Sequence, residues 1–319
     1  MKRIVTVLLG MVLVLNMSSK TRGADKAEEQ AAKAKITLSG AWALYPMAVK
    51  WAEEYKKLHP NITIDISAGG AGKGMADALT GAADLGMVSR EINPAEKEKG
   101  AWWVSVVKDA VLPTFNGGNP VAADLLKRGL SRDEFRGIWV ATNLTSWGAI
   151  VPGGAKAPLR VYTRSDACGA AETWAKYLGA NQEDLKGTGV YGDPGLAEAV
   201  RKDPLGVGFN NLNFAYDLKT GQPVKGIRIL PIDINGNKQI DPEESFYATL
   251  QDIAKAIADG RYPSPPARAL HLVSHDKPAR KEVVEFLRWV LTDGQKFVME
   301  AGYINLPDEK IKEDLKKLD

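Results

Sequence analysis

The chain has 319 residues, with 42 Lys and Arg against 39 Asp and Glu, and a formal net charge of +3 at pH 7. This length allows one or two hydrophobic cores. The near balance of charge argues against a nucleic-acid-binding protein, and the single cysteine, Cys168, excludes an internal disulfide.

The N-terminal segment predicts export. Lys2 and Arg3 precede an apolar run from Ile4 to Leu15, and small or polar residues follow as far as Ala24. This layout is typical of a cleaved secretory signal peptide, here residues 1–24, and the run is shorter than the ~20 residues of a transmembrane helix. Cleavage removes four basic residues and no acidic ones, which leaves a net charge of −1. We therefore expect a periplasmic or otherwise secreted protein without a basic surface for nucleic acid or acidic membranes.

Strands and helices alternate along the rest of the chain, which predicts an α/β fold. Strands are expected at 36–38, 61–66, 84–88, 109–115, 159–163, 206–210, 227–232 and 270–273. Helices are expected at 46–59, 75–79, 131–135, 170–178, 246–258 and 279–291, the third of them capped by Ser131.

Three segments share one design, in which a strand is followed by a tight turn of small residues and then by a helix start. They are residues 40–46, 69–74 and 165–170, and Arg164 opens the third. A helix start offers unpaired backbone amides and a partial positive charge, and small residues let an anion approach the backbone. Together the three turns predict an oxyanion-binding site.

These segments resemble motifs of the phosphate-type solute-binding proteins of ABC transporters. The resemblance rests on an ordered series of motifs, namely residues 38–51, 68–74, 81–90, 138–147, 164–169, 206–209 and 262–272, and extends over about residues 36 to 300. It implies a type II periplasmic-binding-protein fold, in which two α/β lobes, each a central mixed sheet flanked by helices, enclose the ligand. We place lobe one at 36–112 plus 265–319 and lobe two at 113–264.

The resemblance also implies a set of ligand-binding positions. They are Leu44, Tyr45, Ala71, Gly72, Ser89, Arg90, Arg164, Asp166, Cys168, Gly169 and Ala170. Five of them depart from the family pattern. Leu44, Ala71, Cys168 and Ala170 stand where relatives place hydroxyl residues, and Ser89 stands where the best-known relatives place a carboxylate.

Several interpretations of these positions stay open. Arg164 is a ligand contact or forms a surface ion pair with Asp166, and Arg90 is a second contact or an ion pair near the hinge. Trp42, Tyr45 and Trp102 line the cleft or pack in the lobes. The expected function is extracytoplasmic binding of a small oxyanion, phosphate first, for delivery to an ABC permease by a monomeric protein. The alternative is a sensor or interaction module of the same fold that binds a different ligand or none.

The segment 233–244 resembles an EF-hand calcium loop. Oxygen-bearing side chains occupy loop positions 1, 3, 5, 9 and 12, and these are Asp233, Asn235, Asn237, Asp241 and Glu244. This spacing directs alternate oxygens at one hard cation. Lys238 replaces the usual glycine at position 6 and a strand precedes the loop, so a structural calcium ion and a solvated polar turn both stay open. No cofactor is otherwise expected.

Enzyme chemistry is not predicted. The three histidines, His59, His271 and His275, lack metal-ligand spacing. Cys168 at a helix start would have a lowered pKa and could act as a nucleophile. However, no histidine precedes it at a spacing that indicates a catalytic pair, and we expect the thiol to be at least partly shielded from solvent.

Overall fold

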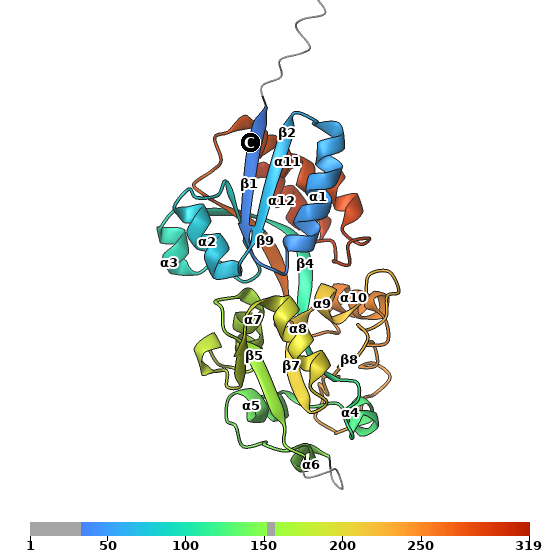
Figure 1. Cartoon of the computed structure of the whole chain (residues 1–319). Helices are drawn as coiled ribbons and strands as arrows, with labels where there is room; N and C mark the ends of the chain where they lie inside the picture. The colour runs from blue at the N-terminus through green and yellow to red at the C-terminus, as the bar shows by residue number, and fades with distance from the viewer. Residues whose placement is uncertain (1–32, 152–156) are drawn as a thin grey trace, which may run out of the picture. The chain divides into compact units, whose positions relative to one another are not determined.

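The computed structural model describes residues 33–151 and 157–319, and Ala34–Asp319 forms one compact unit (Figure 1). The predicted signal peptide, residues 1–24, lies outside the described residues. Within the described ranges, no helix combines the length and the apolarity that crossing a membrane requires.

The first half of the sheet is built around parallel strands near the N-terminus. β1 (Ala34–Gly40) lies between β2 (Ile62–Ala68) and β3 (Leu85–Val88) and is parallel to both. β9 (Ala267–His275) is antiparallel to β3, and β4 (Ala101–Asn116) is antiparallel to β9. This half of the sheet carries the first and second predicted turns at the carboxyl ends of β1 and β2.

The second half continues from the far end of β4. β7 (Gly206–Asn211) and β8 (Ile227–Ile229) pair with β4 antiparallel. β5 (Arg160–Arg164) is parallel to β7, and β6 (Thr188–Val190) is parallel to β5. The third predicted turn therefore follows the carboxyl end of β5.

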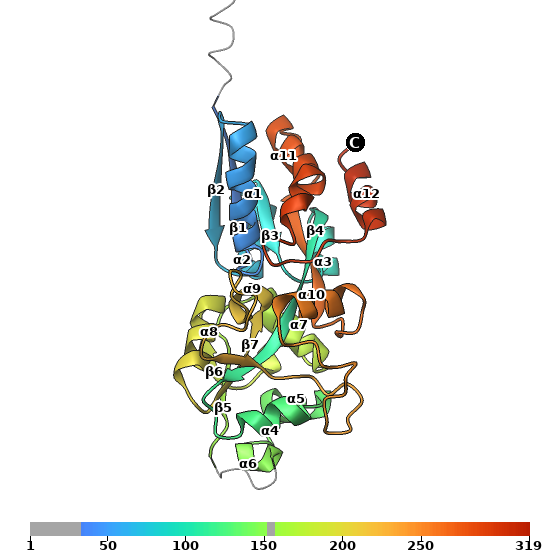
Figure 2. The same cartoon turned by 90° about the vertical axis from the view of Figure 1, so that its right-hand side faces the viewer.

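Helices flank both halves, as two views at right angles show (Figures 1 and 2). They are α1 (Tyr45–Leu58), α2 (Ala71–Leu79), α3 (Pro94–Glu98), α4 (Ala122–Arg128), α5 (Arg132–Trp139), α6 (Trp147–Ile150), α7 (Gly169–Tyr177), α8 (Gly192–Lys202), α9 (Leu212–Ala215), α10 (Leu250–Ala258), α11 (Lys281–Leu291) and α12 (Asp308–Lys316), with 3₁₀ turns η1 (Gln182–Asp184) and η2 (Asp293–Phe297).

The long strand β4 links the two halves. Its residues 101–110 pair with β9, whereas residues 111–116 pair with β7 and β8. Because β4 and β9 lie side by side where the sheet passes from one half to the other, these two strands form the crossing segments of a two-lobed fold.

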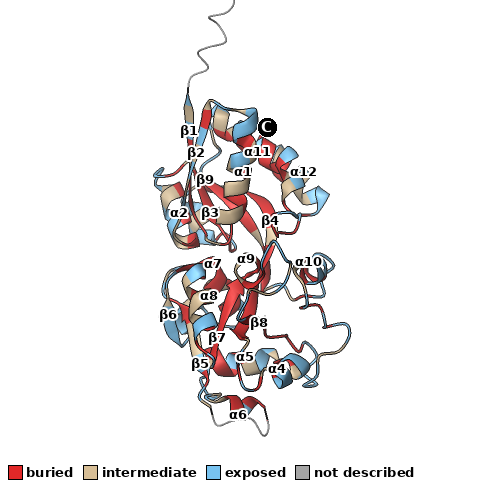
Figure 3. Cartoon of the chain, turned by 45° about the vertical axis from the view of Figure 1, so that its right-hand side comes forward, coloured by how far each residue is buried: buried red, intermediate tan, exposed pale blue. Residues whose placement is uncertain are grey.

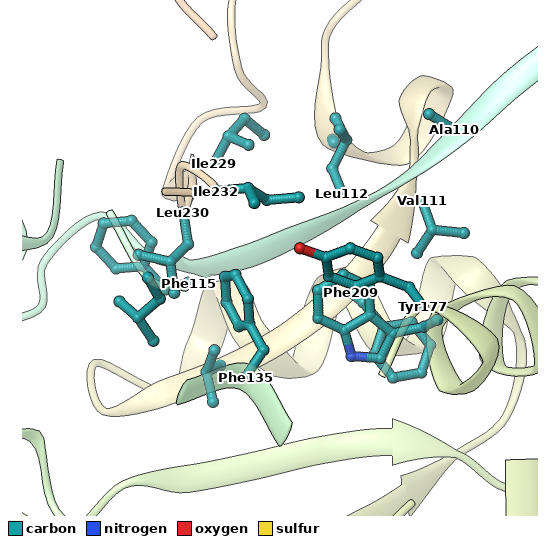
Figure 4. Packing of buried hydrophobic residues seen from close by; sticks show 14 of the residues in the cluster. Ala110, Val111, Leu112, Phe115, Phe135, Tyr177, Phe209, Ile229, Leu230 and Ile232 are labelled. Atoms are coloured by element: carbon teal, nitrogen blue, oxygen red, sulfur yellow. The ribbon is translucent and has the colours of Figure 1, made fainter. Parts of the chain in front are cut away.

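Each lobe has its own hydrophobic cluster (Figure 3). One contains Trp51, Tyr55 and Phe286. The other contains Phe115 and Phe135, and Figure 4 shows the packing of its aromatic and aliphatic side chains. On β4 the clusters change over between Val107 and Ala110, and on β9 between Ala267 and Leu270. These positions lie within a few residues of the predicted lobe boundaries at 112 and 265, which stay a prediction.

Every predicted strand and helix overlaps an observed one, but most bounds differ, and three elements begin four or more residues away from the predicted position. The predicted strand at 109–115 is the end of β4, which begins at Ala101. α2 begins at Ala71, inside the glycine-rich turn and not after it, because Gly70 takes a positive φ of 91° that ends the strand abruptly. α10 begins at Leu250 and not at 246, because the Thr249 hydroxyl caps its first turn.

Candidate functional site

Two helix N-termini, one from each lobe, meet at the centre of the molecule. The Gly72 amide of α2 donates to the Ala167 carbonyl just before α7, at 3.2 Å. A Cβ atom on Gly70 would lie 2.7 Å from that same oxygen, and a Cβ atom on Gly169 would lie 2.4 Å from the Ser89 carbonyl oxygen. The absence of a side chain at Gly70 and Gly169 is therefore what allows the two helix starts to approach.

Four amides at these helix starts have no acceptor in the part of the chain that the structure describes. They belong to Ala71 and Lys73 in α2 and to Gly169 and Ala170 in α7. An amide in the first turn has no intrahelical partner, and the helix dipole adds a partial positive charge. The junction of α2 and α7, defined by these four residues, is thus an electropositive backbone surface suited to an anion.

The first predicted turn offers fewer free amides to an anion than expected. The Leu44 side chain is fully buried in the cluster of lobe one, and its amide donates to the Ala41 carbonyl. The Tyr45 amide also donates to Ala41, and the Tyr45 ring lies 6.3 Å from the Trp42 ring. Leu44 and Tyr45 therefore have their amides paired locally, and Leu44 is a core residue.

Trp42 connects the lobes at this edge. Its ring meets the Tyr191 ring edge-on at 6.3 Å, and a Cβ atom on Gly192 would lie 3.3 Å from it. Of the other aromatic residues, Tyr45 and Trp102 are half-buried against the cluster of lobe one.

Arg164 lies at the end of β5 with its side chain completely buried. Its Nε and Nη2 donate to the two oxygens of Asp166 at 2.8 and 2.6 Å, and its Nη1 donates to Asp193 Oδ2 at 2.6 Å. Burial lowers the pKa of the guanidinium, but Asp193 and Asp166 outweigh this and raise it above its ordinary value. The alternative of a surface ion pair is wrong in its location, because Arg164 does pair with Asp166 but the pair is buried, and Asp193 shares the guanidinium.

Asp193 was not identified from the sequence. It lies in the first turn of α8, after Gly192, whose φ of 73° makes the turn from β6. The same design of strand, glycine turn and helix start occurs here as in the three predicted turns, and this signal would have found it. Asp193 Oδ1 accepts from Asn211 Nδ2 at 2.5 Å.

Asn211 continues a buried polar chain toward the crossing strands. Its Oδ1 accepts from Arg268 Nη2, and Arg268 Nε donates to the Ser89 carbonyl at 3.1 Å. Arg268 Nη1 also lies 3.2 Å from Asp109 Oδ2 on β4. The chain therefore links Arg164 in lobe two to Ser89 in lobe one through Arg268 on β9.

Arg90 forms one ion pair within lobe one and one between the lobes. Its Nη2 donates to Glu96 Oε1 at 2.6 Å, and its Nε lies 2.9 Å from Glu172 Oε2 on α7. Lys176 on α7 pairs with Glu91 at 2.5 Å. The ion-pair interpretation of Arg90 thus agrees with the structure, and its role as a second ligand contact stays a prediction.

A cavity of about 790 Å³ lies beside the junction of α2 and α7. Its walls come from both lobes and from β9, and they include Gly72, Arg90, Cys168, Glu172, Arg268 and His271. Both positive and negative side chains line it, so it has no single sign of charge.

The Cys168 thiol is buried and is the N-cap of α7, where its Sγ accepts from the Ala171 amide at 3.4 Å. Burial raises the pKa of this thiol to about 12, although Arg164 acts in the opposite direction. The expected lowering of this pKa is therefore wrong, because burial outweighs the helix start and the nearby cation, whereas the expected shielding is confirmed.

The loop 233–244 folds back on itself. The carboxylate of Asp233 accepts from the amides of Gly236, Asn237 and Lys238, and Glu244 Oε1 accepts from the Ile234 amide at 2.8 Å. Asp241 Oδ2 accepts from the side-chain amides of Asn235 and Asn237, at 2.8 and 2.9 Å. Across the described residues, no three His, Cys, Asp or Glu side chains converge as metal ligands. Calcium binding stays a prediction.

Comparison with known proteins agrees with this architecture. Residues 25–294 match the family model described as the PBP superfamily domain. The phosphate-binding protein PstS of Methanocaldococcus jannaschii is 26% identical, with 98% of this chain and 94% of the relative aligned. The PstS protein of Bacillus subtilis is 24% identical over 93% of this chain and 89% of the relative.

A solved structure shares the fold. It is a putative phosphate ABC transporter substrate-binding protein with bound phosphate from Clostridium perfringens, with a TM-score of 0.70 at 19% identity, covering 86% of this chain and all of that one. The family match extends over most of the chain, and the two-lobed fold and the facing helix starts accord with it. The chain belongs to the PBP superfamily.

Proposed function

We propose that the protein binds a tetrahedral oxyanion, phosphate first, between its lobes and delivers it to an ABC permease outside the cytoplasm. The observation that carries the proposal is the junction of α2 and α7, where four first-turn amides from two lobes have no acceptor in the described part of the chain. The names of the relatives, PstS and phosphate-binding protein, support phosphate as the ligand.

Backbone amides supply what the missing hydroxyls do not. Ala71 and Ala170 have no side-chain donor, but their backbone amides can donate to an anion directly. An amide at a helix start points along the helix axis, and the helix dipole adds a partial positive charge there. A hydrogen bond to a charged partner is worth about 1.5–3 kcal/mol, so several such bonds together are a substantial source of affinity for a phosphate ion.

Ligand entry requires the two helix starts to separate. The Gly72 amide is bonded to the Ala167 carbonyl, and Gly169 lies against Ser89. Domain closure around a ligand is the usual motion of two-lobed binding proteins. In this proposal the lobes close on the anion and present a joint surface to the permease.

The first prediction removes one amide donor without changing charge. Proline is tolerated at the first position of a helix, where its missing N–H breaks no intrahelical bond. Ala71→Pro should therefore weaken phosphate binding by about 10- to 150-fold, the value of one hydrogen bond to a charged ligand. Isothermal titration of phosphate-depleted protein with phosphate, sulfate and molybdate measures this.

The matched control is Arg132→Pro at the first position of α5, in lobe two and away from the junction. It should leave the dissociation constant unchanged. Equal affinity of Ala71→Pro and the wild-type protein, with both folded by circular dichroism, would exclude the junction as the anion site. Absence of binding to any oxyanion in the wild-type protein would favour the sensor or interaction module instead.

Export and a monomeric state belong to the same proposal. Mass spectrometry of the protein secreted by a bacterial host should give a mature N-terminus near residue 25, and light scattering should give the mass of one chain.

The buried thiol of Cys168 supports binding over catalysis, because a thiol with its pKa raised to about 12 is protonated at neutral pH.

A further inference from the structure

Arg164, the side chain expected to hold the ligand, has each of its three nitrogens already engaged by a carboxylate. Asp166 binds Nε and Nη2 through two parallel hydrogen bonds, and Asp193 binds Nη1 at 2.6 Å. One guanidinium and two carboxylates sum to a net charge of −1 with no exposed guanidinium surface. An incoming anion would meet a negatively charged group of residues and not a free cation.

The two carboxylates have different roles in this arrangement. Asp166 is two residues from Arg164 and holds it in a bidentate pair, which fixes the plane of the guanidinium. Asp193 comes from another element, α8, and engages only one nitrogen. It has further stabilisation of its own, because Asn211 donates to its other oxygen and the first turn of a helix favours a negative charge.

We propose that Asp193 is an internal counter-ion that competes with the ligand for Arg164 and so determines affinity and charge selectivity at the anion site. The inference rests on the proposed function. A bound oxyanion takes the Nη1 edge only when Asp193 moves away from it, and while Asp193 stays nearby its charge opposes dianions more than monoanions. Asp166 is a positioning residue and does not compete.

The displacement of Asp193 has a path to the crossing strands. Asn211 bonds both Asp193 and Arg268, and Arg268 donates to the Ser89 carbonyl in lobe one. Movement of Asp193 therefore changes the partners of Asn211. Asn211 in turn bonds Arg268, whose side chain contacts both lobes.

The test compares two substitutions, each of which removes one negative charge from a carboxylate that pairs with Arg164. Asp193→Asn keeps the shape and removes the competing charge, so the dissociation constant for phosphate should fall by about tenfold or more, which equals about 1.4 kcal/mol. Asp166→Asn loses the bidentate pair that orients Arg164, so the same constant should rise. Titration calorimetry with phosphate and sulfate at pH 7.5 measures both, and the preference for phosphate over sulfate should narrow in Asp193→Asn.

The control is Asp203→Asn, which removes another buried carboxylate of lobe two. Asp203 accepts from Arg160 and Tyr162 and has no contact with Arg164. It should leave phosphate binding unchanged, and thermal unfolding shows whether each variant is folded.

The outcomes separate this inference from the proposed function. In the first outcome, the wild-type protein binds phosphate and Asp193→Asn binds it no more tightly. This result would overturn the competition between Asp193 and the ligand, and would leave the proposed function intact. Binding by Asp193→Asn alone supports the competition and argues against transport by the wild-type protein. If neither protein binds any oxyanion, both the inference and the proposed function are wrong.

Discussion

Asp109 lies in β4, the strand that joins the two lobes, with its carboxyl group almost completely out of solvent. Burial raises the pKa of this group to about 6, against the opposing effects of Arg268 and of the Ala110 and Leu212 amides. An acid whose pKa is raised by folding binds more protons in the folded state, so it favours folding at low pH. That contribution is lost as the pH rises from about 4 to about 6.

The prediction concerns Asp109→Asn, which is neutral at every pH. As the pH rises from 4 to 7, its free energy of unfolding should increase relative to that of the wild-type protein. The increase should be at most about 3 kcal/mol, because a tenfold change in proton affinity is worth about 1.4 kcal/mol. Denaturant unfolding at several pH values measures the difference. A difference that is independent of pH would mean that Asp109 is ionised throughout.

At the scale of the element, the loop 233–244 combines a calcium-type spacing with an unusual backbone. Lys238 has a φ of 65°, the left-handed conformation that the glycine at position 6 of an EF-hand loop adopts. Position 6 therefore takes this conformation without glycine, at a cost of roughly 1–2 kcal/mol for a residue with a side chain, while Gly236, two residues earlier, also has a positive φ of 78°. The carboxylates of Asp233 and Glu244 accept loop amides around this turn.

We predict that calcium binds this loop and that Lys238→Gly binds it more tightly. The substitution removes the backbone strain and also one positive charge from the loop, so the melting temperature should rise in calcium by more than in the wild-type protein. Glu244→Gln should lose the response, and magnesium and a chelator serve as controls in a thermal-shift experiment. A wild-type protein that responds equally to calcium and to chelator would leave the loop a hydrogen-bonded polar turn.

At the scale of the whole molecule, contacts on two sides of the proposed anion site connect the lobes. Trp42 lies against Gly192 on one side, and the pairs of Arg90 with Glu172 and of Lys176 with Glu91 lie on the other. Burial raises the pKa of Glu172 above its ordinary value, although Arg90 acts against this. Both ion pairs are partly exposed, so each contributes about 0.2–1 kcal/mol.

Glu172→Gln should shift the protein toward separated lobes. Arg90 keeps Glu96 in this variant, so only the contact between lobes is lost. Phosphate should bind less than about fivefold more weakly, in line with an ion pair of at most about 1 kcal/mol, and small-angle scattering should give a larger radius of gyration without ligand. Glu198→Gln, which removes a pair within α8, is the control. Tighter binding in Glu172→Gln would contradict this role.

Local patterns in the sequence were enough to predict most elements and, to within four residues, the starts of α2 and α7 at the site, although they missed the start of α8. The Ser131 cap of α5, the glycines of the turn before α2 and the helix start at Gly169 all depend on residues within one turn of each other. Such local preferences are encoded in neighbouring residues, because capping and backbone conformation act over three or four positions.

Only the tertiary structure decided which partners these elements meet. Asp193 is 29 residues from Arg164 and reaches it because β6 pairs with β5, so α8 starts beside the end of β5. The burial of Leu44 and of the Cys168 thiol was equally decided by packing. Strand pairing and desolvation depend on residues far apart in the chain, and no periodicity in a single segment records them.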